Sequence, residues 1–384
     1  MVKKTFTVLG IDTSCDDTCL ALLEVGGDYF QIKKNLVSSQ IKIHQKYGGV
    51  YPTAAKREHL KNLPLLLKKL SFKPASLKKL AAIAVTVGPG LEPCLWTGIN
   101  FAKELAKKWG KPLLPVNHLE AHLWSFLLPP LGQRASLFSK AGAPKKHYGW
   151  FFDLSKLMPA LGLVVSGGHT QLILIKKMGD YKIVGGTRDD AAGECFDKTA
   201  RILGLPYPGG PALAKIADRR TEAARKIKAA FHLVLPRPMI HTPESDFSFS
   251  GLKTAVLYDF MKRPEKVRKS KEYVKIMAQE IEQAVIDVLL KKTIKAAKDF
   301  QVKTIILGGG VAANRALRQQ FLQKTKKELS GVKVFFPLPQ FCTDNAAMIA
   351  LTVWLREMVS VKKRAKKEAK KRKVSLIAQA NLEI

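Results

Sequence analysis

The sequence predicts a mixed α/β protein built from two related lobes with a cleft between them. A pattern of two apolar runs joined by a turn rich in hydroxyl groups, glycine or acids occurs twice, over residues 6–25 and 161–175. Stretches with helical periodicity occupy much of the remaining chain. Because loops at strand ends present backbone N–H groups to phosphates, a cleft between two such lobes is a natural nucleotide site.

Each expected strand is a short apolar run next to a turn. The six strands are Phe6–Ile11, Cys19–Val25, Ala82–Val87, Leu161–Val165, Leu172–Ile175 and Thr304–Leu307. The expected helices have apolar residues that recur every three or four positions. They cover Ala54–Leu70, Gly98–Lys108, Ala192–Leu203, Glu272–Lys298 and Ala312–Lys327.

The composition is that of a folded protein. The chain has 384 residues, of which 46% are hydrophobic, which is enough for a proper core. No apolar run approaches 18 residues, so we expect no membrane span and no membrane partner. The five cysteines are odd in number and widely scattered. They argue against a disulfide framework and predict a reducing compartment, the cytoplasm.

The net charge is +34, from 65 Lys and Arg against 31 Asp and Glu. Such an excess predicts contact with a polyanion, most often a nucleic acid, although a lysine-rich genome would have the same effect. The segment 362–373 carries nine basic residues and one acid. It is either a solvated helix face or a polyanion contact.

His118 and His122 lie four residues apart. On a helix they share a face, so both imidazoles can converge on one metal ion. Glu120 stands one position later than in the H-E-x-x-H motif of zinc peptidases and points elsewhere. The spacing also fits two histidines without a metal, since two ligands are too few. The segment Thr343-Asp344-Asn345, at the start of an apolar helix, is one candidate source of a third oxygen ligand, or an ordinary helix N-cap.

Two glycine-rich segments follow predicted strands. Residues 166–170 read Ser-Gly-Gly-His-Thr, and residues 308–310 are three glycines that lead into a helix. Glycine lets the backbone approach a phosphate closely, although each segment could equally be a plain turn. Neither segment has the Gly-Lys-Ser/Thr ending of a triphosphate-binding P-loop.

Acids precede the helix expected at 192–203, and Asp189 and Asp190 are expected in its first turn, where they suit the helix dipole. Asp197 and Lys198 lie one turn further on and could face the cleft, where they could bind a ribose or form a pair across the lobe boundary. Residues 247–254 alternate aromatic and hydroxyl side chains before a helix. They fit a strand edge followed by an N-cap, or part of a binding surface.

Together these segments resemble one family, the bacterial-type TsaD proteins of tRNA threonylcarbamoyladenosine synthesis, formerly known as glycoproteases. The matching segments are residues 10–18, 46–59, 87–91, 117–122, 164–172, 189–211, 247–255, 308–318 and 342–350. The resemblance covers nearly the whole chain. It implies two duplicated ribonuclease-H-like lobes of the actin/hexokinase-like ATPase superfamily, with an interlobe cleft. We expect residues 1–128 and 345–384 to form the first lobe, 129–159 a basic and aromatic insert, and 160–344 the second lobe.

The resemblance implies an acyltransferase that moves the threonylcarbamoyl group from threonylcarbamoyl-AMP to N6 of adenosine 37 in tRNAs reading codons that begin with A. It implies one divalent metal ion per subunit, bound by His118, His122 and Asp344. Iron and zinc both suit this N/N/O ligand set. The implied substrate-binding residues are Val164, Val165, Ser166, Gly167, Gly168, Asp197, Gly210 and Asn314. Asp12, Ser14 and His169 are candidates for proton transfer.

The implied partners are tRNA, the paralogue TsaB and the small ATPase TsaE, with a TsaC-like enzyme supplying the adenylate. Two other functions fit the residues. One is a small-molecule or protein kinase or ATPase of the same superfamily, and the other is a tRNA-binding protein with a degenerate active site.

Overall fold

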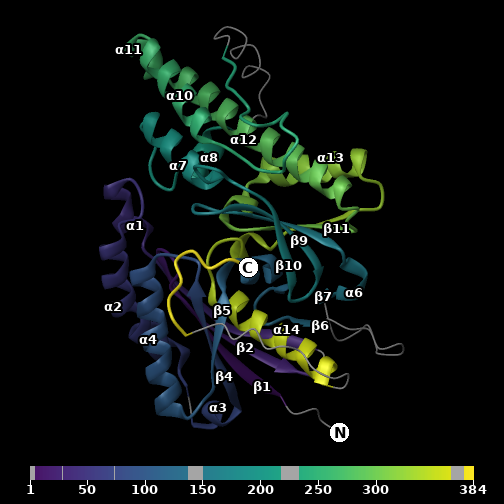
Figure 1. The fold of residues 1–384 in the computed structure, drawn as a ribbon. Helices are drawn as coiled ribbons and strands as arrows, with labels where there is room; N and C mark the ends of the chain where they lie inside the picture. The colour runs from purple at the N-terminus through teal and green to yellow at the C-terminus, as the bar shows by residue number, and fades with distance from the viewer. Residues whose placement is uncertain (1–4, 28, 73, 137–149, 218–232, 365–375) are drawn as a thin grey trace.

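A computed structural model describes residues 5–27, 29–72, 74–136, 150–217, 233–364 and 376–384. The chain forms two lobes, each built on its own mixed sheet (Figure 1). This confirms the predicted α/β class. Residues 137–149 of the expected insert and 365–373 of the basic run lie outside the described residues.

The first sheet has the strand order β5-β4-β1-β2-β3-β6-β7. Strands β1, β2 and β3 form an antiparallel meander, and β4 and β5 run parallel to β1. The bounds are β1 Phe6–Asp12, β2 Asp17–Gly26, β3 Tyr29–Ser39, β4 Leu80–Gly88, β5 Leu113–Asn117, β6 Arg134–Ser136 and β7 Trp150–Phe151. The last two come from the expected insert and extend the sheet at its β3 edge.

The second sheet has the order β10-β9-β8-β11-β12. Its bounds are β8 Ala160–Val165, β9 Thr170–Lys177, β10 Asp180–Gly186, β11 Thr304–Gly308 and β12 Lys333–Phe335. Strands β8, β9 and β10 form an antiparallel meander, and β11 and β12 run parallel to β8. The order β12-β11-β8-β9-β10 therefore repeats β5-β4-β1-β2-β3, so the two lobes share one topology.

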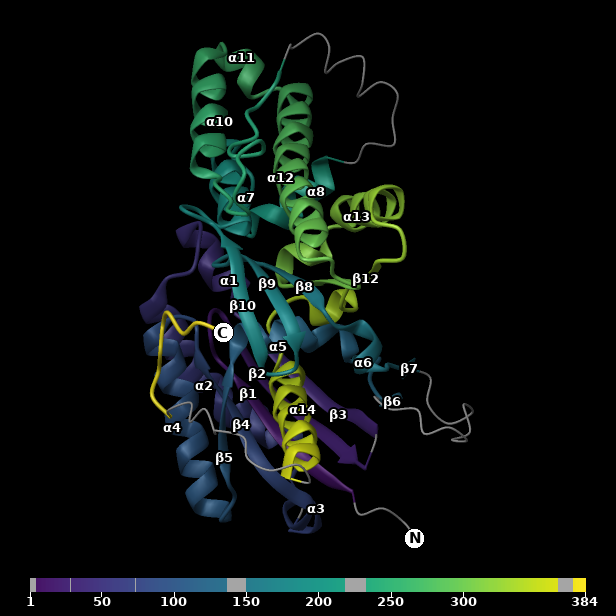
Figure 2. The ribbon, with the colours of Figure 1, turned by 45° about the vertical axis from the view of Figure 1, so that its right-hand side comes forward.

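Helices α2 and α4 pack on one face of the first sheet, and α5 and α14 pack on the other (Figure 2). The alternation of side chains along β1 supplies both cores: Leu9 and Ile11 face α2 and α4, and Val8 faces α14. The helices of this lobe are α1 Ile41–His44, α2 Pro52–Leu70, α3 Pro74–Lys79, α4 Glu92–Trp109, α5 His118–Trp124 and α14 Ala346–Arg364, with 3-10 turns η1 Gln45–Tyr47 and η2 Ser125–Leu127.

The core around α5 and α14 also contains residues of the second sheet, including Ile173 and Ile306. These two helices therefore join the lobes. A separate core surrounds α12, most of whose residues are buried. The second lobe contains α6 Leu154–Leu157, α7 Ala192–Ile202, α8 Gly209–Ile216, α10 Ser250–Lys262, α11 Glu265–Arg268, α12 Lys271–Asp299 and α13 Arg315–Glu328, with η4 Gly310–Ala313 and η5 Pro339–Phe341.

The six predicted strands and five predicted helices are all present, with small shifts at their ends. The helix predicted from Ala312 begins at Arg315, because Asn314 caps it by accepting a hydrogen bond from the Leu317 amide. The helix predicted from Gly98 begins at Glu92, where Pro93 occupies a first-turn position that needs no N–H donor.

The predicted placement of Asp189 and Asp190 in a helix first turn is wrong, because α7 begins at Ala192. Asp189 instead caps α10: its carboxylate accepts hydrogen bonds from the Phe249 and Ser250 amides, at 2.8 and 3.2 Å. The hydroxyl groups of Ser248 and Ser250 also donate to it. Within the described residues, no helix is long and apolar enough to span a membrane.

Gly10 sets how closely α14 approaches the first sheet. A Cβ atom there would lie 2.0 Å from the Ala346 carbonyl oxygen, at the first residue of α14. Asp344 lies two residues before this helix, so the contact also fixes where Asp344 emerges.

We predict that Gly10→Ala lowers the free energy of unfolding by about 1–3 kcal/mol, because the α14 backbone must shift to accommodate the methyl group. Gly186→Ala is the matched control, since a Cβ atom there has no neighbour closer than 4.0 Å. Urea unfolding of both variants measures the difference. Equal stability of Gly10→Ala and wild type would contradict the close packing.

Candidate metal centre between the lobes

Strand ends from both sheets converge on α5. In the first lobe, the parallel strands β1 and β5 end at Asp12 and Asn117, and α5 begins at the next residue after Asn117. In the second lobe, β11 ends at Gly308, where a Cβ atom would lie 2.6 Å from the His122 carbonyl oxygen. The site therefore lies where the carboxyl ends of the two parallel strand sets meet, the usual place for ligands in such sheets.

The local sequence explains why α5 begins at His118. The Asn117 side-chain oxygen accepts hydrogen bonds from the amides of Leu119 and Glu120, at 2.9 and 3.1 Å, which is an N-cap. Its amide nitrogen donates to the Glu383 carbonyl at 3.1 Å. The C-terminal residues therefore lie against the start of this helix.

His118 and His122 share one face of α5, as their spacing predicts. Their ring centroids are 4.6 Å apart in an edge-to-face arrangement, and both side chains are buried. Asp344 approaches from the loop before α14. Its Oδ1 atom lies 3.4 Å from His118 Nε2 and 3.2 Å from His122 Nε2. The three potential ligand atoms lie within 4.8 Å of one another.

The polar atoms around this triad fit a cation. Asp12 Oδ2 lies 3.3 Å from His118 Nδ1, yet neither atom has a well-formed hydrogen bond in the described part of the chain. His122 Nδ1 is also buried without a hydrogen-bond partner there. A buried carboxylate or imidazole without a hydrogen-bond partner destabilises the folded protein unless a nearby charge compensates it. Two imidazole nitrogens and a carboxylate oxygen suit Zn²⁺ or Fe²⁺.

In the absence of a metal, a proton on His118 provides the compensating charge. Burial lowers its pKa, but the Asp12 and Asp344 carboxylates outweigh this and raise it to about 10. Burial and the neighbouring His118 lower the pKa of His122. The pKa of Asp344 is held well below its ordinary value, because the His118 charge outweighs the effect of burial.

The three predicted proton-transfer residues lie around the triad. Asp12 faces His118, and the Ser14 hydroxyl donates to Asp344 Oδ2 at 3.4 Å. The Ser14 amide also donates to Asp12 Oδ1 at 3.1 Å. Burial, followed by the charges of His118 and His122, lowers the pKa of His169 to about 4. His169 is therefore neutral at pH 7.

The two glycine segments lie side by side. Strands β8 and β11 are parallel neighbours, so Ser166 and Gly309 emerge from the same edge of the sheet. Gly309 has φ +89°, and a Cβ atom there would lie 2.3 Å from the Val165 carbonyl oxygen. Gly167 and Gly168 are exposed and have open space at their Cβ positions. Val164 and Val165 have fully buried side chains, so only their backbone could meet a ligand.

Of the remaining predicted substrate-binding residues, Asp197 lies in the middle of α7, Gly210 in the first turn of α8 and Asn314 at the N-cap of α13. Asp197 Oδ1 accepts a hydrogen bond from the Gly209 amide at 2.6 Å, beside Gly210 at the start of α8. Burial raises the Asp197 pKa to about 6, although the Gly209 and Gly210 amides oppose this. The Asn314 side chain is engaged at both ends, because it caps α13 and donates to Glu282 Oε1 at 2.7 Å.

Sequence reasoning missed the contacts that join the lobes beside the cleft. The Gln45 side chain donates to the Tyr207 carbonyl at 2.9 Å, and the Tyr207 hydroxyl donates to Asp16 at 3.4 Å. Arg201 also donates to the Gly48 carbonyl. All of these residues except Gln45 fall within motif segments. No pattern in one sequence shows which residues more than 150 positions apart will meet.

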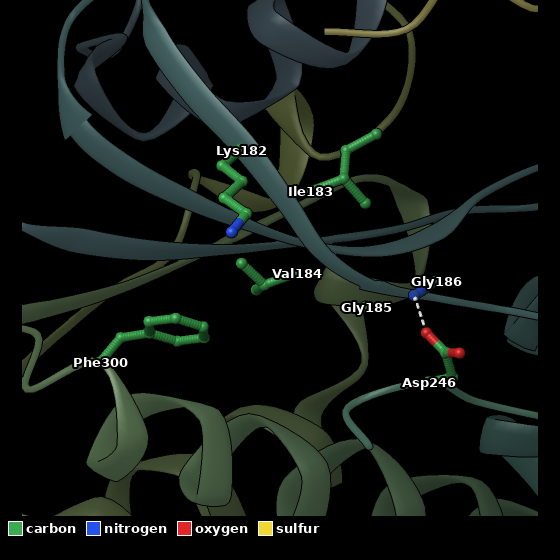
Figure 3. Close-up of a pocket in the computed structure, with 7 residues that line it drawn as sticks. All are labelled: Lys182, Ile183, Val184, Gly185, Gly186, Asp246 and Phe300. Carbon is green, nitrogen blue, oxygen red and sulfur yellow. Dashed lines mark hydrogen bonds between the residues drawn. The ribbon is translucent and has the colours of Figure 1, made fainter.

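A cavity of about 400 Å³ lies elsewhere, along the edge strand β10 (Figure 3). It is lined by Lys182, Ile183, Val184, Gly185, Gly186, Asp246 and Phe300. None of the predicted site residues lines it. The Gly186 amide donates to Asp246 at 3.0 Å across its rim.

Comparisons with known proteins agree with this geometry. A family profile described as tRNA N6-adenosine threonylcarbamoyltransferase (TsaD) matches residues 31–136 and 149–351. The chain is 45% identical to the tRNA N6-adenosine threonylcarbamoyltransferase of Thermosipho africanus, over 90% of this chain and 92% of the relative. It is 41% identical to that of Persephonella marina, over 91% and 90%.

Among solved structures, the fold is similar to full-length HypF in a phosphate- and nucleotide-bound form. The TM-score is 0.51 at 12% identity, with 94% of this chain and 47% of that chain covered. The chain thus corresponds to about half of HypF. At this identity the likeness concerns the fold alone, and it supports the predicted two-lobed class.

Asp17 lies in the acidic surroundings of the triad, and the pH dependence of its effect on stability tests how strongly those surroundings shift its pKa. Its Oδ1 atom is buried without a hydrogen-bond partner in the described residues, and burial, then the Asp344 carboxylate, raise its pKa to about 7. A carboxyl whose folded pKa exceeds its unfolded pKa becomes increasingly destabilising as the pH rises between those two values. This destabilisation is complete above about pH 7.

We predict that Asp17→Asn stabilises the chelator-treated protein more at pH 8 than at pH 5.5, by at least about 1 kcal/mol. Urea unfolding of wild type and variant at both pH values measures the difference. The same stability change at both pH values would show that Asp17 titrates normally in the folded protein.

Proposed function

The chain belongs to the TsaD family of tRNA N6-adenosine threonylcarbamoyltransferases, and on that premise we propose that it performs the reaction for which the family is named. The threonylcarbamoyl group of threonylcarbamoyl-AMP is transferred to N6 of adenosine 37 in tRNAs that read codons beginning with A. The N6 nitrogen bonds to the carbamoyl carbon, the bond from that carbon to the phosphate oxygen breaks, and AMP leaves. One N6 proton is lost to a base.

The observation that carries the proposal is the position of the triad against the glycine segments. His118, His122 and Asp344 converge in the first lobe, and Gly308 of the second lobe touches the His122 backbone. A substrate with a phosphate at one end and a carbonyl at the other can therefore span the two lobes. Since AMP carries a single phosphate, the absence of a triphosphate-binding P-loop agrees with this substrate.

We propose that His118, His122 and Asp344 hold one divalent metal ion per subunit, Fe²⁺ or Zn²⁺. When bound, such an ion acts as a Lewis acid that polarises a carbonyl and stabilises negative charge as the amine attacks. With the ion on His118 Nε2, the Nδ1–H group of His118 would face Asp12 Oδ2, which lies 3.3 Å from Nδ1, and the Ser14 hydroxyl donates to Asp344 Oδ2. Such supporting contacts hold metal ligands in position. Because Asp12 and Ser14 face the proposed metal ligands, we assign them to supporting those ligands and not to proton transfer.

His169 is the better candidate for accepting the N6 proton. It follows Gly168, it is partly exposed, and it is neutral at pH 7, so its imidazole can accept a proton. The backbone N–H groups of Gly167 and Gly168 offer donors to the phosphate of AMP. Asp197 offers a carboxylate to the ribose hydroxyl groups, and Gly210 lies beside it.

The chain has a net charge of +34, and we propose that its positively charged surface attracts tRNA. We propose TsaB-like and TsaE-like proteins as partners and a TsaC-like enzyme as the source of the adenylate. We also propose the cytoplasm as the compartment, because the five cysteines are free. The family relationship favours this function over a small-molecule kinase or ATPase and over a degenerate tRNA-binding protein.

We predict that His118→Ala abolishes stoichiometric metal binding and lowers the rate of threonylcarbamoyl transfer by about 100-fold or more. AMP binding should survive, because the glycine segments are unchanged. His241→Ala is the control, since His241 is an exposed histidine of the second lobe outside the site.

The measurements are metal content, AMP affinity and transfer to unmodified tRNA in the presence of the partner proteins. Two results together would favour the kinase or ATPase function: wild type modifies no tRNA, and the His118→Ala variant still hydrolyses ATP. If wild type binds tRNA but neither binds metal nor transfers the threonylcarbamoyl group, the result would favour a tRNA-binding protein with a degenerate active site.

A further inference from the structure

Glu120 lies between the two histidines in sequence but points away from them in space. Residues 118 and 122 share a face of α5, and residue 120 lies on the opposite face. Its side chain is only 4% exposed. A buried carboxylate is costly unless its oxygens are paired, so its partners define its role.

Arg356 of α14 pairs with Glu120 through both carboxylate oxygens. Its Nε atom donates to Oε1 at 3.2 Å and its Nη2 atom donates to Oε2. Its third donor, Nη1, reaches the Pro115 carbonyl of β5 at 3.0 Å. A bidentate arginine–carboxylate pair fixes orientation as well as distance. The pair therefore locks α5, α14 and β5 together.

The second lobe contributes to the same cluster through Tyr181 of β10. The Tyr181 hydroxyl donates to Glu120 Oε1 at 2.9 Å and accepts a hydrogen bond from Trp124 Nε1 at 3.0 Å. Trp124 is fully buried on α5. The four side chains thus form one continuous polar cluster between the sheets, which we call the Glu120 cluster. It comprises Glu120, Arg356, Tyr181 and Trp124.

The Glu120 cluster joins the two elements that carry the triad. His118 and His122 are on α5, and Asp344 lies two residues before α14. Helices are stiff, so an anchor at Arg356 constrains the start of α14 together with its packing on Gly10. Every donor and acceptor in the cluster depends on the others, so a change at one member leaves buried polar groups unpaired.

We propose that Glu120 and Arg356 are positioning residues, which hold α5 and α14 at the separation that brings His118, His122 and Asp344 together. Tyr181 fixes the second lobe to the same anchor. The functional role of this positioning rests on the proposed metal site. The spacing of the two helices can be tested without a metal.

The test compares Glu120→Gln with Glu280→Gln. Glu280 is another buried glutamate paired with an arginine, Arg237, but this pair lies wholly within the second lobe. Both changes keep the side-chain shape and remove a buried charge, so both should lower stability. Only the first should disturb the triad.

The first readout is the affinity for Co²⁺, a spectroscopic substitute for zinc or iron, by chelator competition with the visible spectrum recorded. We expect Glu120→Gln and Arg356→Met to weaken Co²⁺ binding by about tenfold or more and to alter the spectrum. Glu280→Gln should leave both unchanged. Tyr181→Phe, which removes one hydroxyl group and should fold, is expected to weaken binding by a smaller factor.

The second readout is backbone hydrogen exchange in chelator-treated protein. Glu120→Gln should raise the rate of backbone hydrogen exchange in peptides that cover residues 113–124 and 342–356. Glu280→Gln should leave the exchange rate of both peptides unchanged. Equal Co²⁺ affinity and unchanged exchange in Glu120→Gln would overturn the proposal. If wild type binds no Co²⁺, the proposed metal site fails, and the exchange data alone decide whether Glu120 positions the helices.

Discussion

The burial of α5 between two sheets is the constraint on which the rest of the structure depends. A seven-residue helix that carries two histidines and a glutamate can be buried only if each polar group finds a partner. The N-cap at Asn117, the Asp344 carboxylate on one face and the Glu120 cluster on the other supply most of these partners. The Nδ1 atoms of His118 and His122 stay without a hydrogen bond in the described residues, which is the requirement that a bound cation would meet. The polar groups that stabilise α5 are therefore the same groups that create the site.

The duplicated topology explains why a two-lobed protein has one such centre. Each lobe presents the carboxyl ends of its parallel strands toward the other, and α5 occupies the space where these ends meet. The first lobe contributes side chains that suit a metal, and the second contributes glycines with exposed backbone. The two lobes thus share an architecture, and in the proposed function they supply different chemistry: metal ligands from one and anion-binding donors from the other.

Much of the fold and part of the site could be predicted from the sequence. The hairpins follow from local alternation and turn residues, and the shared face of His118 and His122 follows from helical spacing. The segment 343–345 is one candidate source of a third ligand, and only the resemblance singles out Asp344 within it. The Glu120 cluster could not be predicted, because Glu120 meets partners 61 and 236 positions away. The cap by Asp189 was missed for a similar reason, since its partners begin 59 positions later.

The most direct test of the account is the location of a metal ion in crystals of the metal-loaded protein, by anomalous scattering at the absorption edge of the bound metal. We predict one ion per chain, bound by His118 Nε2, His122 Nε2 and an Asp344 oxygen, at about 2.0–2.2 Å if the ion is zinc. An ion bound by cysteine sulfur or by residues remote from α5, or no ion at the triad, would contradict it.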